Sequence, residues 1–410
     1  MPTGLHNFTQ DVIVWLSEVI ASVRRRLLGV ELLPQDQLLI SLIKGELTVD
    51  CLEALIKSQP DWHSVLDKAV QEGVFYPFYR NLLLSDAEDK LIPDELRERF
   101  RQTYYLHILK STDFLYRIER VLNYIETLKI KILLFKGPAI DSFLYDDFLR
   151  PRLDLDIAVR DEEMPFLESA LLELGYAAPK DEKDYPLPEY LNSRLFIPPL
   201  PKTTDSSPVG CSMNNSDGLI PVHIHKHLIN NMFLSVDGVL SVDMKKVWEE
   251  TQPFKGYHYI CILKPELNIV YLCEHGLKHN FEQMVFLYEI EQLIRRYGGS
   301  LDWKKFLALV ENFSLSRVVY YGLYFAKRIL SADIPEKVIE GLKPKRFTAA
   351  EKIFIKNTLD KKHRRYSSYS VYLAMRKGLL KKARFIFRTL FPPQFTLKGY
   401  LIRIRRLILA

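Results

Sequence analysis

The chain has 410 residues, a formal net charge of +6 and 48% hydrophobic residues, which is enough for about two or three domains with buried cores. Its four cysteines lie far apart, at positions 51, 211, 261 and 273, which excludes a dense disulfide framework and a close cysteine metal pair. No apolar run reaches about 18 residues, and no secretory signal pattern opens the chain. We therefore expect a soluble protein of a reducing cytoplasm.

The first part of the chain has the spacing of helices. Asp11–Leu28 and Phe100–Leu128 carry apolar residues at steps of three and four, and few β-branched runs interrupt them. This spacing gathers apolar side chains on one face of a helix, which then packs on a core. Residues 1–128 are predicted to form a helical N-terminal region.

The period of the apolar residues changes near residue 130. Ile130–Phe135 and Leu153–Val159 are apolar runs of strand length, and a short helix is predicted between them, from about Pro138 to Leu144. Glu162–Leu174 returns to helical spacing, and Gly175 ends that helix. The expected order is strand, turn, helix, strand and helix.

Asp154 and Asp156 lie two residues apart on the second of these strands. Alternate residues of a strand point to the same face of a sheet, so we expect the two carboxylates side by side. Mg²⁺ takes oxygen ligands from one or two carboxylates and from substrate phosphates. The pair therefore predicts a site for Mg²⁺, or for Mn²⁺, next to the phosphates of a nucleotide. A solvated pair of aspartates is the plainer alternative.

A lysine and a glycine follow the first strand. Gly137 lets backbone N–H groups approach a phosphate closely, and the positive end of the following helix favours an anion there. Lys136 is expected to neutralise charge on the phosphates, with Arg150 and Arg152 as nearby cations. Taken alone, a lysine–glycine pair is also typical of an ordinary turn.

In this order, the residues resemble the nucleotidyltransferase superfamily related to DNA polymerase β, whose members pair a glycine-containing turn with a downstream Asp-x-Asp strand. More narrowly, the chain resembles a large bacterial family of uncharacterised nucleotidyltransferases, from about Trp62 to Pro393. The residues that carry this narrower likeness are Leu134-Phe135-Lys136-Gly137, Tyr145, Arg150-Pro151, Asp154-Leu155-Asp156, Val222-His223-Ile224-His225 and His275-Gly276-Leu277-Lys278-His279.

The resemblance implies an α/β (α+β) fold, with a small mixed β-sheet core between helical N-terminal and C-terminal regions. It also implies a Mg²⁺-dependent enzyme that moves a nucleoside monophosphate from an NTP, expected to be ATP, to an acceptor hydroxyl or phosphate. Asp154 and Asp156 would bind the metal, and Lys136 and Gly137 the phosphates. The sequence does not identify the acceptor, and it lacks the continuous basic groove near the motif that nucleic acid requires.

The superfamily's third carboxylate, on a later strand, is the general base or a second metal ligand. His223 stands at that position in this chain. An imidazole accepts a proton or binds a metal, but it brings no negative charge to a two-metal site. Three alternatives follow. His223 or His225 is the catalytic base, or an acid such as Asp217 or Asp237 substitutes, or the protein is a catalytically silent nucleotide-binding module.

The histidines support a separate hypothesis. His223, His225 and His227 alternate and so share one face of a strand, and His275 and His279 lie one helical turn apart. Zinc ligands occur at such spacings. The helical pair lacks the glutamate that a metalloprotease uses as base, and packed helical histidines are the commoner case. A zinc-binding protein is therefore the second alternative.

The rest of the chain divides by composition. Residues 129–235 form the predicted nucleotidyltransferase core, which contains a proline- and serine-rich insertion at 179–221 with a brief strand at Ser193–Ile197. The insertion is predicted to be a long loop beside the site. It is a lid, a substrate selector or, as its composition favours, a disordered segment. Residues 236–345 are predicted to form a helical C-terminal domain, and 346–410 a basic amphipathic tail.

The basic charge is concentrated near the end of the chain. Residues 361–410 contain fourteen lysines and arginines and no acidic residue, so the first 360 residues carry a net charge of −8. Cations mixed with large apolar residues are typical of a helix at an anionic membrane surface, or of a contact with an acidic partner or nucleic acid. The alternative is a terminal helix that packs its apolar side on the body. In the membrane case the cytoplasmic protein would lie at the inner membrane face.

Overall fold

The computed structural model describes the segments that contain most of the predicted elements. The predicted helix Asp11–Leu28 and most of the insertion 179–221 lie outside the described residues, as does the predicted helix Pro138–Leu144 except for Ala139. The described residues are 34–45, 57, 60–84, 88, 92–137, 139, 154–177, 193–198, 219–229, 242–360 and 368–390.

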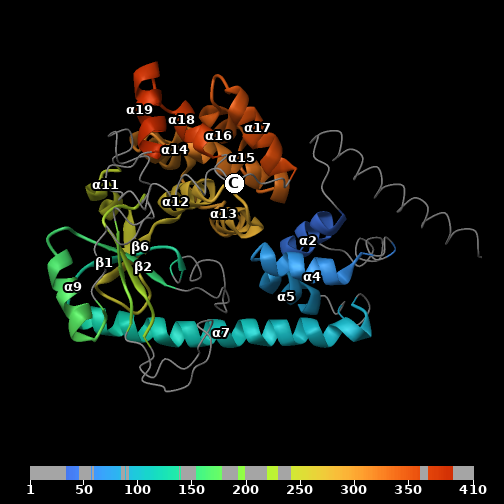
Figure 1. The fold of residues 1–410 in the computed structure, drawn as a ribbon, viewed down its shortest axis with the longest axis horizontal. Coiled ribbons are helices and arrows are strands. Elements are labelled where there is room, and N and C mark those ends of the chain that lie inside the picture. Colours follow the sequence, from blue (N-terminus) through green and yellow to red (C-terminus); the bar gives the residue numbers. More distant parts are fainter. Residues whose placement is uncertain are drawn as a thin grey trace, which may run out of the picture.

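The strands in the described part of the chain form one six-stranded mixed sheet with the order β3-β4-β2-β1-β6-β5 (Figure 1). Its strands are β1 (Ile132–Leu134), β2 (Leu155–Val159), β3 (Ser193–Phe196), β4 (Val222–His225), β5 (Thr251–Pro253) and β6 (Ile260–Leu263). β1 is antiparallel to β2 and parallel to β6, and β2 is parallel to β4. The side chains of β1, β2, β4 and β6 are all buried, as in a sheet that is covered on both faces. The predicted fold class is confirmed.

Two of these strands lie in the C-terminal region, which the sequence predicts to be mainly helical. The sequence predicts mainly helix beyond Val236, but β5 and β6 are strands of the sheet. β6 is a four-residue apolar run, and such a short run does not distinguish a strand from a buried helical turn by its periodicity. β6 pairs with β1, so the sheet takes an inner strand from beyond residue 235, where the predicted core ends.

The two strands of the motif and the helix that follows them are confirmed. β1 and β2 lie within the predicted strands, and α9 (Met164–Glu173) lies within the helix predicted at Glu162–Leu174. Gly175 follows α9 with a φ angle of +87°, a left-handed conformation that glycine adopts without a steric penalty. β3 coincides with the brief strand predicted at Ser193–Ile197.

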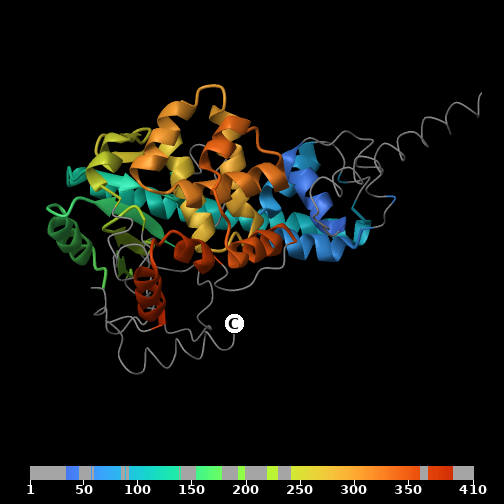
Figure 2. The ribbon, with the colours of Figure 1, turned by 90° about the horizontal axis from the view of Figure 1, so that it is seen from above.

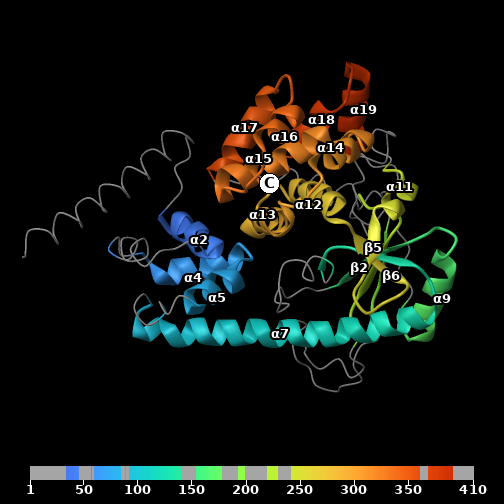
Figure 3. The ribbon, with the colours of Figure 1, turned by 180° about the vertical axis from the view of Figure 1, so that it is seen from behind.

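The 34-residue helix α7 (Asp94–Thr127) connects the N-terminal helices to the sheet, as Figures 1 and 3 show from opposite sides. Two acidic residues in its first turn complement the positive end of the helix dipole. Near its other end, the Glu126 carboxylate accepts hydrogen bonds from the backbone N–H groups of His258 at 2.7 Å and Tyr259 at 3.1 Å. These bonds attach α7 to the segment that leads into β6.

The other helices form an N-terminal group, two separate helices near the sheet (Figure 1) and a C-terminal group that packs around α12, α13 and α15. α19 projects from the C-terminal group (Figure 2). No described helix combines the length and the hydrophobicity needed to cross a membrane. The bounds are α2 (Pro34–Lys44), α4 (Trp62–Gln71), α5 (Phe75–Leu84), α11 (Met244–Glu249), α12 (Pro265–Lys278), α13 (Met284–Tyr297), α14 (Trp303–Asn312), α15 (Ser316–Leu330), α16 (Glu336–Leu342), α17 (Ala349–Leu359), α18 (Tyr369–Ala374) and α19 (Leu379–Leu390).

Two helices of the C-terminal group approach each other very closely. Gly322 of α15 faces Cys273 of α12, and a Cβ atom built at position 322 would lie 2.5 Å from the Cys273 Sγ atom. Real side chains do not pack at that distance, so this helix contact requires glycine.

Candidate nucleotide and metal site

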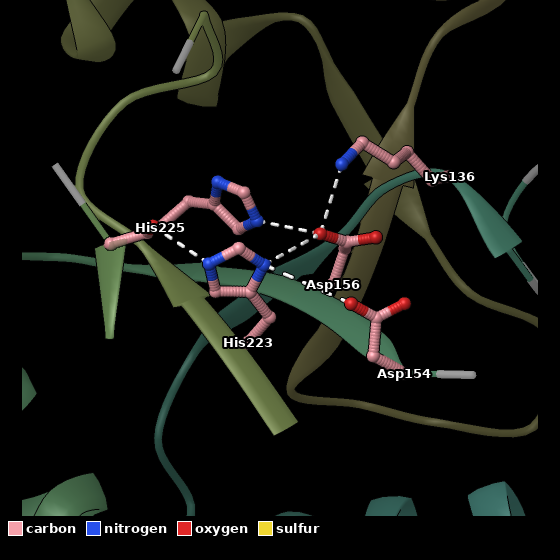
Figure 4. Close-up of polar contacts among 6 residues, drawn as sticks. Lys136, Asp154, Asp156, His223 and His225 are labelled. Atoms are coloured by element: carbon pink, nitrogen blue, oxygen red, sulfur yellow. Dashed lines mark hydrogen bonds and ion pairs between the residues drawn. The ribbon is translucent and has the colours of Figure 1, made fainter. Parts of the chain in front are cut away.

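The chain turns sharply where β1 ends. Lys136 and Gly137 both have left-handed backbone conformations, with φ angles of +58° and +43°, and the N–H of Ala139 donates to the Lys136 carbonyl at 3.0 Å. This conformation is unfavourable for lysine, and strained backbone of this kind is concentrated at functional sites. The turn places the Lys136 side chain beside β2 (Figure 4).

The parallel pairing of β2 with β4 brings a predicted carboxylate and two predicted histidines together. Asp156 pairs with His223, and His225 lies two residues further along β4. Paired residues share a face of the sheet, and so do residues two apart, so all three side chains project from one face. Figure 4 shows these side chains pointing toward one another, with Lys136 and Asp154 beside them.

Three nitrogen atoms surround the Oδ1 atom of Asp156. The Lys136 ammonium lies 2.9 Å from it, His225 Nε2 lies 2.6 Å from it, and His223 Nδ1 lies 3.5 Å from it. Burial by itself raises the pKa of Asp156, but the charge of Lys136 and the hydrogen bonds from the two histidines hold that pKa well below its usual value. Asp156 is therefore ionised at neutral pH.

His225 is almost completely buried. Burial lowers its pKa to about 3, against the opposing effect of its hydrogen bond to Asp156, so the imidazole is neutral at neutral pH. Because a carboxylate only accepts, Nε2 carries the proton of that bond. Phe135 packs edge-on against the ring at a centroid distance of 4.9 Å. The Nδ1 atom is buried and has no hydrogen-bond partner among the described residues.

His223 contacts a residue that the sequence did not identify as part of the site. Its Nε2 atom lies 2.7 Å from the Ser193 Oγ atom, and its Nδ1 atom lies 3.9 Å from Asp154 Oδ2. The antiparallel pairing of β3 with β4 positions Ser193. The sequence signal at Ser193 was its place in a short predicted strand, which does not reveal the strand's partner. The hydrogen bond directs the other ring nitrogen, Nδ1, toward the two aspartates.

The two aspartates differ in exposure. The side chain of Asp154 is 41% exposed, whereas that of Asp156 is 8% exposed. Asp154 precedes β2 and so lies closer to the surface, while Asp156 lies within the strand. The carboxylate of Asp154 is therefore more accessible than that of Asp156, which lies among its nitrogen partners.

The cluster has the composition of a metal-binding site. Asp156, His223 and His225 each offer one donor atom, and these atoms lie within 4.8 Å of one another. A carboxylate and two imidazoles are suitable ligands for a divalent cation. The two nitrogen donors fit Mg²⁺ less well, because Mg²⁺ prefers oxygen.

Several predicted residues are not seen in the cluster. Arg150 and Arg152 lie outside the described residues, as do Asp217 and Asp237. His227 is exposed beyond the end of β4 and is not one of the clustered metal-type ligands.

The histidine pair at the C-terminal end of α12, formed by His275 and the capping residue His279, lies in a row of aromatic rings. The His275 and His279 rings are 4.8 Å apart, Phe286 stacks on His279 at 5.3 Å, and Tyr271 stacks on His275 at 6.0 Å. Tyr271 also contacts Phe135 at 5.5 Å. Within the described residues, the pair therefore packs against the neighbourhood of the site and does not join the strand histidines as a metal ligand set.

One of the comparisons with known proteins identifies a family. A family model described as an uncharacterised nucleotidyltransferase matches residues 58–331, from just before α4 to just after α15. The chain belongs to this nucleotidyltransferase family. The match contains the whole sheet and every residue of the cluster, but it ends before Pro393, to which the resemblance was expected to extend. No curated protein and no solved structure matches this nucleotidyltransferase family member.

Proposed function

We propose that the protein moves a nucleoside monophosphate from an NTP, with ATP as the donor, to an acceptor hydroxyl or phosphate in the cytoplasm. The observation that supports this most is the contact between the turn after β1 and the Asp-x-Asp strand, where Lys136 lies 2.9 Å from the ionised Asp156. Transfer of a phosphoryl group depends on positioning and on charge stabilisation more than on covalent chemistry of the protein. The cluster contains groups for both tasks.

Each part of the turn and strand has a role in this proposal. Gly137 gives the triphosphate close access to backbone N–H groups, and Lys136 neutralises charge on the leaving pyrophosphate. Asp154 and Asp156 hold a divalent cation, which when bound neutralises the phosphates. The two arginines predicted to bind phosphate remain part of the proposal, although they lie outside the described residues.

The two histidines have different roles. His225 is a positioning residue, because its buried neutral ring donates a hydrogen bond to Asp156 and holds that carboxylate in place. His223 faces both aspartates through Nδ1 and stands where the superfamily has its third carboxylate. It supplies a nitrogen donor at that position.

A second function, nucleotide binding without turnover, is favoured by the same His223. An imidazole does not add the negative charge that a two-Mg²⁺ site uses. In this second case the protein is a regulatory module that binds an NTP and releases no pyrophosphate.

The test is calorimetric titration of the full chain with each of the four NTPs, with and without Mg²⁺ or Mn²⁺. The variants are Asp154→Asn/Asp156→Asn and, as a matched control, Asp161→Asn, whose exposed carboxylate lies just after β2. Pyrophosphate release is assayed in the same samples, with a protein-free cell extract as the source of acceptors.

The outcomes separate the two functions. Cation-dependent NTP binding that is lost in the double variant and kept in Asp161→Asn supports the site. Pyrophosphate release then supports the transferase, and its absence supports the silent module. If the wild-type protein binds no NTP under any of these conditions, both functions are wrong.

A further inference from the structure

We propose that Asp156, His223 and His225 bind a first-row transition-metal dication, of the series from Mn²⁺ to Zn²⁺, in preference to Mg²⁺. This inference rests on the proposed function, which places a divalent cation at this site, and it adds the class of cation that the site selects. The family resemblance implies Mg²⁺, whereas two of the three clustered donor groups are imidazoles.

The first argument for this preference is the chemistry of the donor atoms. Mg²⁺ is small and hard, requires near-octahedral oxygen ligands and releases its water reluctantly. Imidazole nitrogen suits Zn²⁺, Fe²⁺ and Ni²⁺, and two histidines with one carboxylate are a common ligand set for Fe²⁺. The exposed Asp154 adds a further oxygen on the side of His223.

The second argument is the spacing of the donor atoms. Asp156 Oδ1 lies 2.6 Å from His225 Nε2 and 3.5 Å from His223 Nδ1. Ligand atoms bound to Zn²⁺ at about 2.0–2.1 Å in a tetrahedron lie about 3.3 Å from one another. Shifts of less than about 1 Å therefore bring these atoms to coordination distance.

The third argument is the surroundings of the two imidazole rings. Metal-binding histidines usually engage their second ring nitrogen with an oxygen, and His223 does so through Ser193 Oγ at 2.7 Å. The second nitrogen of His225 has no hydrogen-bond partner among the described residues. When Nε2 binds a metal, the proton moves to Nδ1, and the bond to the metal replaces the hydrogen bond that Nε2 donates to Asp156.

The experiment is titration of the chelator-treated full chain, without nucleotide, with Mn²⁺, Co²⁺, Zn²⁺ and Mg²⁺. Calorimetry measures affinity, and the visible absorption of bound Co²⁺ reports nitrogen ligands directly. The informative variant is His223→Asp, which restores the carboxylate of the superfamily. Ser193→Ala keeps all three ligands and removes the partner of His223, and His227→Asp is an exposed control beyond β4.

We expect Co²⁺ and Zn²⁺ to bind wild type at least about tenfold more tightly than Mg²⁺, and His223→Asp to reduce that preference by roughly 10–100-fold. Ser193→Ala should weaken Co²⁺ binding by roughly tenfold and leave Mg²⁺ unchanged. His227→Asp should match wild type. Equal affinity of wild type for Co²⁺ and Mg²⁺, or the same preference in folded His223→Asp, would overturn the inference. Because no NTP is present, failure of the proposed function would appear only in the nucleotide titration.

A second inference concerns α19 and rests on different observations. Leu379, Leu380 and Phe387 of this helix are exposed by 86%, 84% and 61%. At about 100° per residue, these three side chains lie on one face, opposite Phe385. Phe385 is buried and packs against the Arg376 guanidinium at 3.9 Å. The helix is therefore attached to the body by one side and presents its apolar side outward.

Cations border this apolar side. Lys382 and Arg384 lie on its two edges, Lys381 lies further around the helix, and the sequence of α19 contains no acidic residue. An apolar face bordered by cations is the arrangement of a helix that lies in the surface of a membrane with anionic lipids. We infer that α19 binds such a surface, since the alternative predicted from sequence, an apolar side packed on the body, does not describe its exposed leucines.

Vesicle sedimentation tests this inference with the full chain. The vesicles contain phosphatidylcholine alone or with anionic phosphatidylglycerol. The variant is Leu379→Glu/Leu380→Glu/Phe387→Glu, and the matched control is Phe166→Glu, which changes a 70% exposed apolar residue on α9. We expect wild type and the control to sediment with anionic vesicles only, and the triple variant to stay in solution with an unchanged melting temperature. Equal sedimentation of the triple variant, or no sedimentation of wild type, would overturn the inference.

Discussion

The ammonium of Lys136 lies 2.9 Å from the Oδ1 atom of Asp156, the oxygen that also accepts a hydrogen bond from His225. The contact joins the turn after β1 to the beginning of β2. It also means that the lysine and a divalent cation would use the same carboxylate oxygen. Binding of a cation and release of Lys136 toward a triphosphate are then linked.

Lys136→Met tests this link. Without the competing ammonium, Co²⁺ or Mn²⁺ should bind about tenfold more tightly in the absence of nucleotide, because the positive charge of Lys136 no longer repels the cation. NTP affinity should fall by at least about tenfold, because the phosphates lose a cation. Calorimetry measures both. Lys131→Met is the control, since Lys131 lies over the Trp248 ring, away from the cluster. Unchanged metal affinity in Lys136→Met would contradict the linkage.

Substitution of each aspartate should affect NTP binding in both cases but stability mainly at Asp156. Asp156→Asn leaves the Lys136 ammonium and two histidines around a neutral amide, so we expect the free energy of unfolding to fall by about 1–3 kcal/mol. Asp154→Asn changes a half-exposed carboxylate and should alter stability by less than about 0.5 kcal/mol. Both variants should lose cation-dependent NTP binding. Urea unfolding and calorimetry measure the two effects, and equal stability of the variants would contradict the difference in burial.

Acid should destabilise the fold through His225. Its pKa is about 3 in the folded protein and 6.5 when unperturbed, so below pH 6.5 the unfolded chain binds a proton that the folded protein does not. The free energy of unfolding should fall by about 1.4 kcal/mol per pH unit well inside that window. Asp156, whose folded pKa is depressed, adds a loss of stability as the pH falls below its usual value of 3.8.

Urea unfolding at about pH 7 and about pH 5 measures this dependence. The change in stability per pH unit should be smaller in His225→Gln, which cannot titrate at this position. His227→Gln, which changes an exposed side chain beyond β4, is the matched control. A His225→Gln slope equal to that of wild type would show that other groups control acid stability.

Gly322→Ala should destabilise the C-terminal helices. The new methyl group would meet the Cys273 Sγ atom at 2.5 Å and the backbone of α12 at 3.0 Å, so the helices must separate. We expect a loss of about 1–3 kcal/mol in the free energy of unfolding. Gly341→Ala in α16 is the control, because nothing lies within 4 Å of its added carbon, and it should stabilise the protein by up to about 1 kcal/mol. Equal stability of the two variants would contradict this packing.

The sequence determined the local elements of the site. The Lys136–Gly137 turn, the strand that contains Asp156 and the histidine strand are predictable because alternation and glycine chemistry act over a few neighbouring residues. The same holds for α9 and its end at Gly175. The predicted sheet lacked β6, because a four-residue apolar run carries too little periodicity to identify a strand.

Only the tertiary structure decided which of these residues meet. His225 and Asp156 are 69 positions apart, and His223 and Ser193 are 30 apart, so their contacts depend on strand pairing and register, which distant parts of the chain set together. Burial then distinguished Asp156 from Asp154 and made His225 a neutral partner of the carboxylate. The orientation of α19 was decided in the same way, because the packing of Phe385 against Arg376 turns the apolar side of the helix outward.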